Sequence, residues 1–286
     1  MTSNFYTLIT GASEGFGRSL ALECARRKMN LILVALPGEA LRSLTECIKA
    51  NYAVDVLAIE KDLCDDDGCY EVYQRVVEIE LQVNVLINNA GVGTTGLFGD
   101  ASTSEYEQQI KLNVLVTTVL TRLFLGMLKN NSPSHILNVG SMASFFPLPK
   151  KQVYGATKSF IYYFSQSLRA ELRKDKVFVS LVCPGVMKTN KTVTAIIERS
   201  PYLLRHSCME PERLAPVVIK NMMAGKRRII AGKLNIGYLM LYTLLPAFVQ
   251  QIITDRTMKK LSSHNGPVAF SQGQLALEVQ EIDGSR

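Results

Sequence analysis

Short apolar runs alternate with longer segments of helical spacing over the first two thirds of the chain. The runs are apolar on both faces, which is typical of parallel strands that helices cover on two sides. This alternation predicts an α/β fold built on a doubly wound parallel sheet. Right-handed crossovers would place the C-terminal ends of all strands at one edge, where such sheets bind ligands. The expected strands are Tyr6–Thr10, Leu31–Ala35, Val54–Glu60, Val83–Asn88, Ser134–Val139 and Val177–Val182.

The composition and continuity of the chain indicate one folded domain. The 286 residues are 47% apolar and 20% charged, so the chain can bury a large core and is not of the disordered class. No repeat, low-complexity segment or flexible linker divides it, and we expect a domain over 1–260 followed by a polar tail over 261–286. The alternation stops near residue 185. Residues 186–233 hold basic, proline-punctuated helical pieces with a short strand at Arg228–Ala231, and residues 234–260 form an apolar helical extension.

The charge balance is mildly basic. Lys and Arg number 32 against 25 Asp and Glu, which gives a net charge of +7. The excess is spread along the chain instead of forming a dense stripe, so we expect no nucleic-acid partner. It suits an anionic cofactor or an acidic membrane face.

Cysteine and histidine usage gives no sign of a metal or disulfide framework. The six cysteines include no C-x-x-C pair and the three histidines are scattered, so we expect free thiols and no metal site. The N-terminal residues lack the basic and apolar regions of a secretory signal peptide. Together these features predict a cytoplasmic protein.

A glycine-rich loop, Thr10–Gly17, joins the first expected strand to the first expected helix. Glycine allows a sharp turn and the close approach of a pyrophosphate, and a helix N-terminus offers unpaired N–H groups to its charge. Three glycines alone would also suit an ordinary strand–helix turn. The position favours dinucleotide binding, although the spacing is G-x-x-x-G-x-G and not G-x-G-x-x-G.

A Tyr154/Lys158 pair has the four-residue spacing that places two side chains on one face of a helix. Such a pair alone usually belongs to a solvated face. Here Ser141, Asn88–Gly91 and Pro184-Gly185 each follow an expected strand, so they would meet at the same edge of the sheet as the glycine loop. Their convergence indicates an active site.

The chemistry of these residue types is that of carbonyl reduction. Reducing a ketone requires a proton on oxygen as hydride reaches carbon. A tyrosine, with an ordinary pKa of about 10, can supply it if an ammonium such as that of Lys158 stabilises the phenolate. The hydroxyl of Ser141 could hold the substrate oxygen.

The set of motifs resembles the short-chain dehydrogenase/reductase family, in its branch of roughly 250–290 residues. The resemblance is strong over about residues 5–190, weaker to about 260, and implies a single Rossmann-like domain. The matching motifs are Thr10–Gly17, Asp62, Asn88–Gly91, Asn113, Ser141, Tyr154 with Lys158, and Pro184-Gly185 with Thr189.

The resemblance implies an NAD(P)(H)-dependent oxidoreductase that interconverts a ketone and a secondary alcohol. In it Tyr154 is the general acid/base, Lys158 lowers the pKa of Tyr154 and binds the nicotinamide ribose, and Ser141 orients the carbonyl. Asn113 kinks its helix and holds a proton-relay water. Many members have Gly where this chain has Ser144, which would adjoin the substrate pocket. The residues implied to bind the cofactor are Gly11, Ser13, Gly15, Phe16, Gly17, Asp62, Leu63, Asn89, Ala90, Gly91, Tyr154, Lys158, Pro184, Gly185, Val186 and Thr189.

The choice between NAD(H) and NADP(H) stays open in the sequence. In the family an acidic residue at the end of the second strand selects NAD, but this chain has Ala35 there. Basic residues that favour NADP are missing at Leu36 and Glu14, although Arg18 and Arg42 could reach the site. We expect a slight preference for NADP(H), because similar reductases with Ala at that strand end usually use it.

The segment from 186 to 232 matches the family's substrate-binding region in position, and it does not identify the substrate. The strongly apolar residues 234–253 suit family members that act on lipid-like carbonyls, so we expect an apolar substrate. Basic residues flank them at Lys226–Lys233 and Arg256–Lys260. The apolar stretch could span a membrane, lie on its surface or pack on protein. Its expected apolar row is Leu234, Tyr238, Leu241, Leu245, Phe248 and Ile252.

Two other functions share parts of these motifs. A non-catalytic dinucleotide sensor or scaffold would share the fold, but such relatives usually lose the Tyr or the Lys. Sugar-nucleotide epimerases of similar fold have longer chains with G-x-x-G-x-x-G spacing, so this function fits the sequence poorly.

The resemblance also implies a homo-oligomer, because the family commonly pairs through the helices that carry Asn113 and Tyr154. The apolar residues Phe160, Ile161, Phe164 and Leu168 would permit that contact, and packing in the core would give the same pattern.

Overall fold

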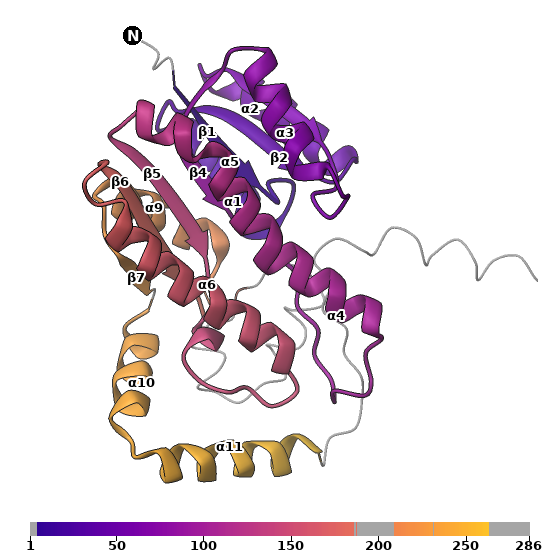
Figure 1. Cartoon of the computed structure of the whole chain (residues 1–286), viewed down its shortest axis with the longest axis vertical. Helices are drawn as coiled ribbons and strands as arrows, with labels where there is room; N and C mark the ends of the chain where they lie inside the picture. Colours follow the sequence, from indigo (N-terminus) through magenta and orange to yellow (C-terminus); the bar gives the residue numbers. More distant parts are fainter. Residues whose placement is uncertain (1–4, 186, 188–208, 231, 263–286) are drawn as a thin grey trace, which may run out of the picture.

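The structure, a computed structural model, describes residues 5–185, 187, 209–230 and 232–262. Its centre is a seven-stranded sheet in the order β3-β2-β1-β4-β5-β6-β7, and every neighbouring pair is parallel (Figure 1). The predicted doubly wound α/β fold is therefore confirmed. The strands are β1 (Phe5–Thr10), β2 (Asn30–Ala35), β3 (Val56–Glu60), β4 (Gln82–Asn88), β5 (Ser134–Val139), β6 (Val177–Cys183) and β7 (Arg228–Ile230).

Helices cover both faces of this sheet. Helices α1, α2 and α9 bury their apolar sides on one face, and α3 and α5 bury theirs on the other. Helix α6 packs on β6. The helices are α1 (Gly15–Arg26), α2 (Glu39–Asn51), α3 (Gly68–Glu78), α4 (Thr103–Ile110), the π-helix η1 (Lys111–Val116), α5 (Thr117–Asn130), the 3-10 helix η2 (Met142–Ser144), α6 (Gln152–Glu171), α9 (Pro211–Met223), α10 (Lys233–Leu244) and α11 (Ala247–Ser262).

The central strands are apolar on both faces because both faces are buried. Successive side chains of a strand point to opposite sides of a sheet. Ile9 accordingly packs with α1 and α2, whereas its neighbour Leu8 packs with α3 and α5, and both are fully buried. Leu33 and Val34 of β2 divide in the same way. A continuous apolar run is therefore what each central strand requires.

The long helical stretch after β4 is not one regular helix. Ser102 begins α4 with a capping box that it shares with Glu105. A π-helical turn, Lys111–Val116, then separates α4 from α5 and contains Asn113. By length and composition alone the stretch Thr103–Asn130 could cross a membrane. That is weak evidence, because its buried side chains, including Phe124, pack on the sheet.

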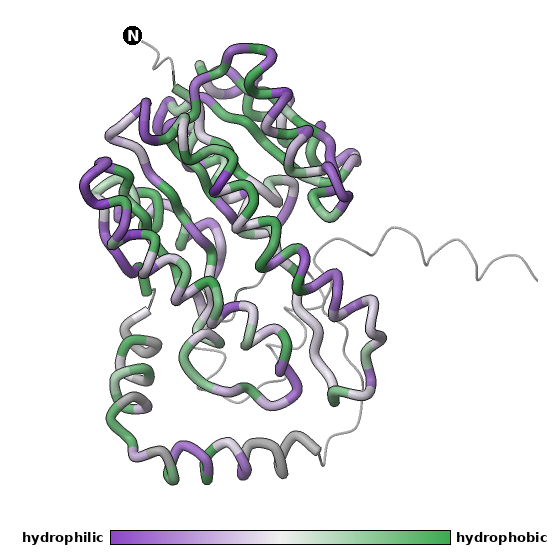
Figure 2. Tube along the Cα trace, in the orientation of Figure 1, coloured by the Kyte–Doolittle hydropathy of each residue, from purple (hydrophilic) through white to green (hydrophobic). Residues whose placement is uncertain are grey.

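Two predicted apolar faces differ from the structure. Helix α10 ends at Leu244 and α11 begins at Ala247, because the intervening Leu245 is extended and Pro246 lacks the N–H that would continue the helix. The expected single row from 234 to 252 is therefore wrong, and the two helices form an elbow (Figures 1 and 2). On α6, Ile161 is buried in the core while Phe160 is exposed, so the expected apolar face on this helix is also divided.

Candidate active site

The sheet order brings the loops that carry the predicted site residues to one edge. Strands β1, β4, β5 and β6 are consecutive neighbours and all are parallel, so their C-terminal ends lie side by side. The connections leave β1 and β4 toward opposite sides, which makes the β1–β4 boundary the place where doubly wound sheets hold ligands. The glycine loop, Asn88–Gly91, Ser141 and Pro184-Gly185 all follow these four strands.

The glycine loop can adopt its shape only with glycine at several positions. Gly11 has φ of 63° and Gly15 has φ of 52°, both in the left-handed region that side chains disfavour. Gly17 is required for a different reason, because a Cβ there would lie 2.0 Å from the carbonyl oxygen of Gly11. The start of α1 therefore lies directly against the end of β1.

Asn89 ties the glycine loop to the loop after β4. Its Nδ2 donates to the carbonyl oxygens of Thr10 at 2.9 Å and Gly11 at 3.0 Å. In return the hydroxyl oxygen of Thr10 accepts from the backbone N–H groups of Asn89 and Ala90, each at 3.0 Å. Four hydrogen bonds thus hold two loops, 78 residues or more apart in sequence, at a fixed separation.

The N-terminus of α1 has the properties of an anion site. Glu14 occupies the N-cap but its side chain makes no capping hydrogen bond, and the first turn contains no acidic residue. Its positive dipole end is therefore not neutralised by the helix itself. Ser13 and Gly15 beside it are partly exposed, whereas Phe16 is buried in the core. These residues fit the pyrophosphate of a dinucleotide.

Tyr154 and Lys158 lie on one side of α6, with the Lys158 Nζ 5.8 Å from the centroid of the Tyr154 ring. Lys158 is only 6% exposed, and its Nζ donates to the carbonyl oxygen of Val139 at 2.9 Å. Burial lowers the pKa of Lys158 to about 8. Burial also raises the pKa of Tyr154, while a hydrogen bond with Ser141 acts in the opposite direction. Burial therefore disfavours both the Lys158 ammonium and the Tyr154 phenolate, unless the two opposite charges are present together.

Asn113 connects the loop after β4 to α6. Its Nδ2 donates to the carbonyl oxygen of Val92 at 2.8 Å and to the hydroxyl of Thr157 at 3.0 Å, and its Oδ1 accepts from the N–H of Val92 at 2.9 Å. A Cβ at Gly91 would lie 2.9 Å from the Asn113 Oδ1 and 3.4 Å from the Lys158 Nζ. The absence of a side chain at this position therefore leaves room for the Asn113 amide, with the Lys158 Nζ at contact distance.

The residues after β5 hold α6 in position through hydrogen bonds. Ser141 accepts a hydrogen bond from the N–H of Ala143 at 3.1 Å. Ser144 donates its hydroxyl to the carbonyl oxygen of Lys158 at 2.8 Å, and its own carbonyl oxygen accepts from Ser159 at 3.1 Å. Ser144 is 7% exposed. The hydroxyl that was expected beside a substrate pocket is thus engaged in anchoring the helix of Tyr154.

Comparison with known proteins identifies the family. A family model described as short chain dehydrogenase matches residues 6–198. The chain belongs to the short-chain dehydrogenase family. A curated relative, the very-long-chain 3-oxoacyl-CoA reductase-B of Danio rerio, is 29% identical over 190 residues. That match covers 64% of this chain and 60% of the relative, so the chain spans less than two thirds of the relative's length.

Two further comparisons extend the likeness. The 3-oxoacyl-[acyl-carrier-protein] reductase FabG of Aquifex aeolicus is 27% identical over 186 residues, which cover 65% of this chain and 75% of that protein. A solved short-chain dehydrogenase from Sphingobium yanoikuyae in complex with NADPH has a TM-score of 0.72 and 27% identity. The structural match covers 92% of this chain and 97% of the Sphingobium chain.

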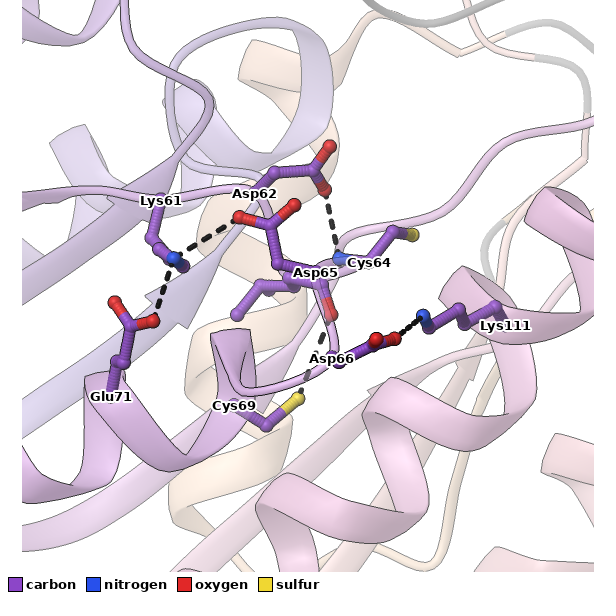
Figure 3. A network of polar contacts seen from close by, with 9 residues as sticks. Lys61, Asp62, Cys64, Asp65, Asp66, Cys69, Glu71 and Lys111 are labelled. Carbon is purple, nitrogen blue, oxygen red and sulfur yellow. Dashed lines mark hydrogen bonds and ion pairs between the residues drawn. The ribbon is translucent and has the colours of Figure 1, made fainter.

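The remaining predicted site residues that the structure describes follow β3 and β6. Asp62 and Leu63 follow β3, where the Asp62 carboxylate accepts from the N–H of Cys64 at 2.8 Å (Figure 3). Lys61 beside them is held by ion pairs to acidic residues, so this turn is fixed at the sheet edge. The carbonyl oxygen of Pro184 accepts from the N–H of Met142, which joins the β6 end to the loop after β5. Val186 and Thr189 lie outside the described residues.

Sequence reasoning missed several residues that shape the site. Gly93 lies against the Tyr154 ring, and a Cβ there would come within 2.7 Å of the Tyr154 Cδ2. Thr157 supports Asn113, and the hydroxyl of Thr10 receives the Asn89 backbone. Thr157 is adjacent to the Tyr/Lys pair and Thr10 begins the glycine loop. Gly93 carries no sequence signal, because its role depends on a contact between distant segments.

We expect Gly17→Ala to lower the free energy of unfolding by about 3 kcal/mol, because its Cβ would overlap the Gly11 carbonyl oxygen. Urea denaturation followed by circular dichroism measures this change. Gly99→Ala is the matched control, since a Cβ at Gly99 has open space around it. Equal stability of the two variants would show that the start of α1 does not lie against β1 in the way described.

Proposed function

We propose that this chain is an NAD(P)(H)-dependent oxidoreductase that interconverts a ketone and a secondary alcohol. The observation that supports it most strongly is the buried ammonium of Lys158, 5.8 Å from the ring centroid of Tyr154. This pair lies at the edge where the glycine loop and the loop after β4 meet. A proton donor beside a dinucleotide cradle is the arrangement that carbonyl reduction needs.

Each residue of the proposed centre has a defined task. Tyr154 donates a proton to the carbonyl oxygen in reduction and removes it from the alcohol in oxidation. Lys158 stabilises the tyrosinate, and the Ser141 hydroxyl orients the substrate oxygen. Asn113 holds the backbone of Val92 and thereby the wall of the site. When bound, the nicotinamide supplies or accepts the hydride.

We assign the phosphates and the nicotinamide ribose of that cofactor to the cradle formed by the glycine loop and the loop after β4. Gly11, Ser13 and Gly15 would hold the pyrophosphate with their backbone N–H groups, close to the N-terminus of α1. Asn89 would act by fixing the loop, because its Nδ2 is already engaged by the carbonyl oxygens of Thr10 and Gly11. Lys158, buried beside the glycine at position 91, would reach the ribose hydroxyls.

The substrate is proposed to be apolar and of the 3-oxoacyl type. Two relatives are named 3-oxoacyl reductases, which supports a fatty-acyl ketone. A cavity of about 540 Å³ lies beside the first turns of α6, between the segment 146–149 and α11. Its walls include Phe146, Pro147, Leu148 and Ala156. These apolar side chains suit an aliphatic chain.

We expect Tyr154→Phe to lower the rate of ketone reduction by about 100-fold or more, because the phenol that supplies the proton is gone. The rate is followed by the loss of absorbance of the reduced cofactor with 3-oxoacyl substrates. Tyr163→Phe, at an exposed position of the same helix, should leave the rate unchanged. Full activity in Tyr154→Phe would refute the mechanism, and tight cofactor binding without any turnover would favour the scaffold alternative.

The structure gives a physical reason to propose NADP(H). Ala35 ends β2 beside Glu60, the last residue of β3, so an acid does lie near the expected adenosine ribose. Arg42 pairs with that carboxylate through two hydrogen bonds of 2.8 and 3.1 Å. The hydrogen bond from Arg42 lowers the pKa of Glu60, and the guanidinium charge offsets the repulsion between this carboxylate and a 2′-phosphate. The NADPH bound to the Sphingobium relative supports the same cofactor.

We expect Arg42→Ala to weaken NADPH binding about tenfold more than NADH binding, because it exposes the negative charge of Glu60 to the 2′-phosphate. Fluorescence titration of the two reduced cofactors gives both dissociation constants. Arg75→Ala removes an equally exposed guanidinium on α3 and should change neither constant. An unchanged ratio of the NADPH and NADH dissociation constants in Arg42→Ala would contradict the proposed preference for NADP(H).

We propose a cytoplasmic protein that contacts an anionic lipid surface through α10 and α11. Among the side chains of α10 and α11 that the structure describes, six large apolar ones are exposed, and Leu244 is 81% exposed. The five from position 240 onward are termed the elbow surface. The exposed basic residues Lys226, Arg227 and Arg228 precede α10, and exposed Arg256 lies on α11. Apolar side chains flanked by positive charge fit the interface of an acidic bilayer. The elbow surface consists of Met240, Leu241, Leu244, Phe248 and Ile252.

We expect the full chain to sediment with phosphatidylglycerol vesicles, and the double variant Leu244→Glu/Phe248→Glu to lose most of this binding. Glutamate at these positions removes apolar contact and adds repulsion from the lipid charge. The control Leu97→Glu/Phe98→Glu alters two exposed apolar residues elsewhere and should bind as before. Equal sedimentation of both variants would overturn the proposal. So would concentration-dependent self-association through the elbow surface without lipid binding.

A further inference from the structure

Lys151 places a second ammonium against the candidate proton donor. It lies immediately before α6, and its Nζ is 5.2 Å from the centroid of the Tyr154 ring. The Nζ of Lys158 is 5.8 Å from the same centroid. One lysine thus stands a turn before the tyrosine and the other a turn after it. The motif Tyr154-x-x-x-Lys158 gives no indication of the first.

The position of Lys151 is unfavourable for the helix and for the charge. A cation at a helix N-terminus opposes the positive end of the helix dipole, and the Lys151 side chain makes no capping hydrogen bond there. Burial disfavours its charged form and lowers its pKa. The adjacent Lys150 has φ of 63°, a conformation that side chains rarely adopt. The helix end and the burial therefore both disfavour an ammonium at this position.

The Tyr154 ring offers this ammonium an attractive interaction. An ammonium over an aromatic face is attracted by the electron density of the ring. Ionising the phenol adds a negative charge to that ring, so the same ammonium stabilises phenolate more than phenol. The interaction therefore favours the ionised form of Tyr154. It acts in the same direction as the ammonium of Lys158.

Among the described residues, the other groups that face Tyr154 do not provide a positive charge. The loop after β4 contributes Gly93, and the loop after β5 contributes the hydroxyl of Ser141. From β6, burial raises the pKa of the Cys183 thiol to about 12, so this thiol is neutral at physiological pH. The two lysines of the α6 segment are thus the cations that these elements place around the ring.

We propose that Lys151 is a positioning residue for proton transfer, a second ammonium that stabilises the tyrosinate of Tyr154. This inference rests on the proposed function. In alcohol oxidation the tyrosinate is the base that takes the hydroxyl proton, so the rate below its pKa follows the ionised fraction. Removing the charge of Lys151 makes the tyrosinate less stable, so the oxidation rate rises only at a higher pH.

The test compares pH profiles of kcat/KM for oxidation of a 3-hydroxyacyl substrate. We expect Lys151→Met to move the rising limb upward by about one pH unit, with a roughly tenfold loss of rate at pH 7. Lys151→Arg keeps the charge and should restore the wild-type profile. Lys129→Met is the control, because Lys129 pairs with Asp175 at the last turn of α5, at the opposite edge of the sheet.

An unshifted profile in Lys151→Met would overturn the inference. A rise in KM for acyl-CoA alone, with kcat and the limb unchanged, would also overturn it and would assign Lys151 to binding of the anionic substrate. Failure of the proposed function is seen separately, as full activity in Tyr154→Phe. Carbon-13 NMR titration of the Tyr154 ring needs no turnover, and it must show the same upward shift in folded Lys151→Met.

Discussion

The burial of a lysine ammonium is the constraint on which the candidate site depends. Lys158 is 6% exposed, so its charge must be matched by nearby groups. The carbonyl oxygen of Val139 at the end of β5 accepts a hydrogen bond from the Lys158 Nζ, and the Tyr154 ring lies beside this ammonium. A Cβ at position 91 would lie only 3.4 Å from the Nζ, so the glycine there forms the adjacent wall. Ser144 anchors the backbone of the same residue, so both ends of Lys158 are held.

The doubly wound sheet makes this arrangement possible at one edge. Because β1 and β4 are parallel neighbours, their loops leave the sheet together and Asn89 can bind the carbonyl oxygens of the glycine loop. The π-helical turn after α4 directs Asn113 to the same edge, where it holds the loop after β4 and contacts α6 through Thr157. The fold thus determines the separation between the dinucleotide cradle and the Tyr154/Lys158 pair.

Sequence patterns predicted the strands and the loops because these features are local. An apolar run such as Leu31–Ala35 indicates burial on both faces of a strand. The glycines of Thr10–Gly17 indicate a backbone turn with positive φ angles. Gly93 and Lys151 could not be found in this way, since their roles arise from contact with Tyr154 across a loop and a helix start. The elbow of α10 and α11 was missed because apolar spacing continues through Pro246, although the backbone does not.

We propose that Tyr154 and Lys158 titrate as a coupled pair, in which the tyrosine loses its proton while the lysine stays charged. Carbon-13 labelling of the tyrosine ring and nitrogen-15 labelling of lysine follow both groups by NMR with oxidised cofactor bound. Without cofactor, burial lowers the pKa of Lys158 to about 8 and raises that of Tyr154. With oxidised cofactor bound, we expect the reverse order, in which the first proton lost from the pair as pH rises comes from Tyr154 and its ring carbon moves to the phenolate position. Loss of that proton from Lys158, with Tyr154 still a phenol, would contradict it.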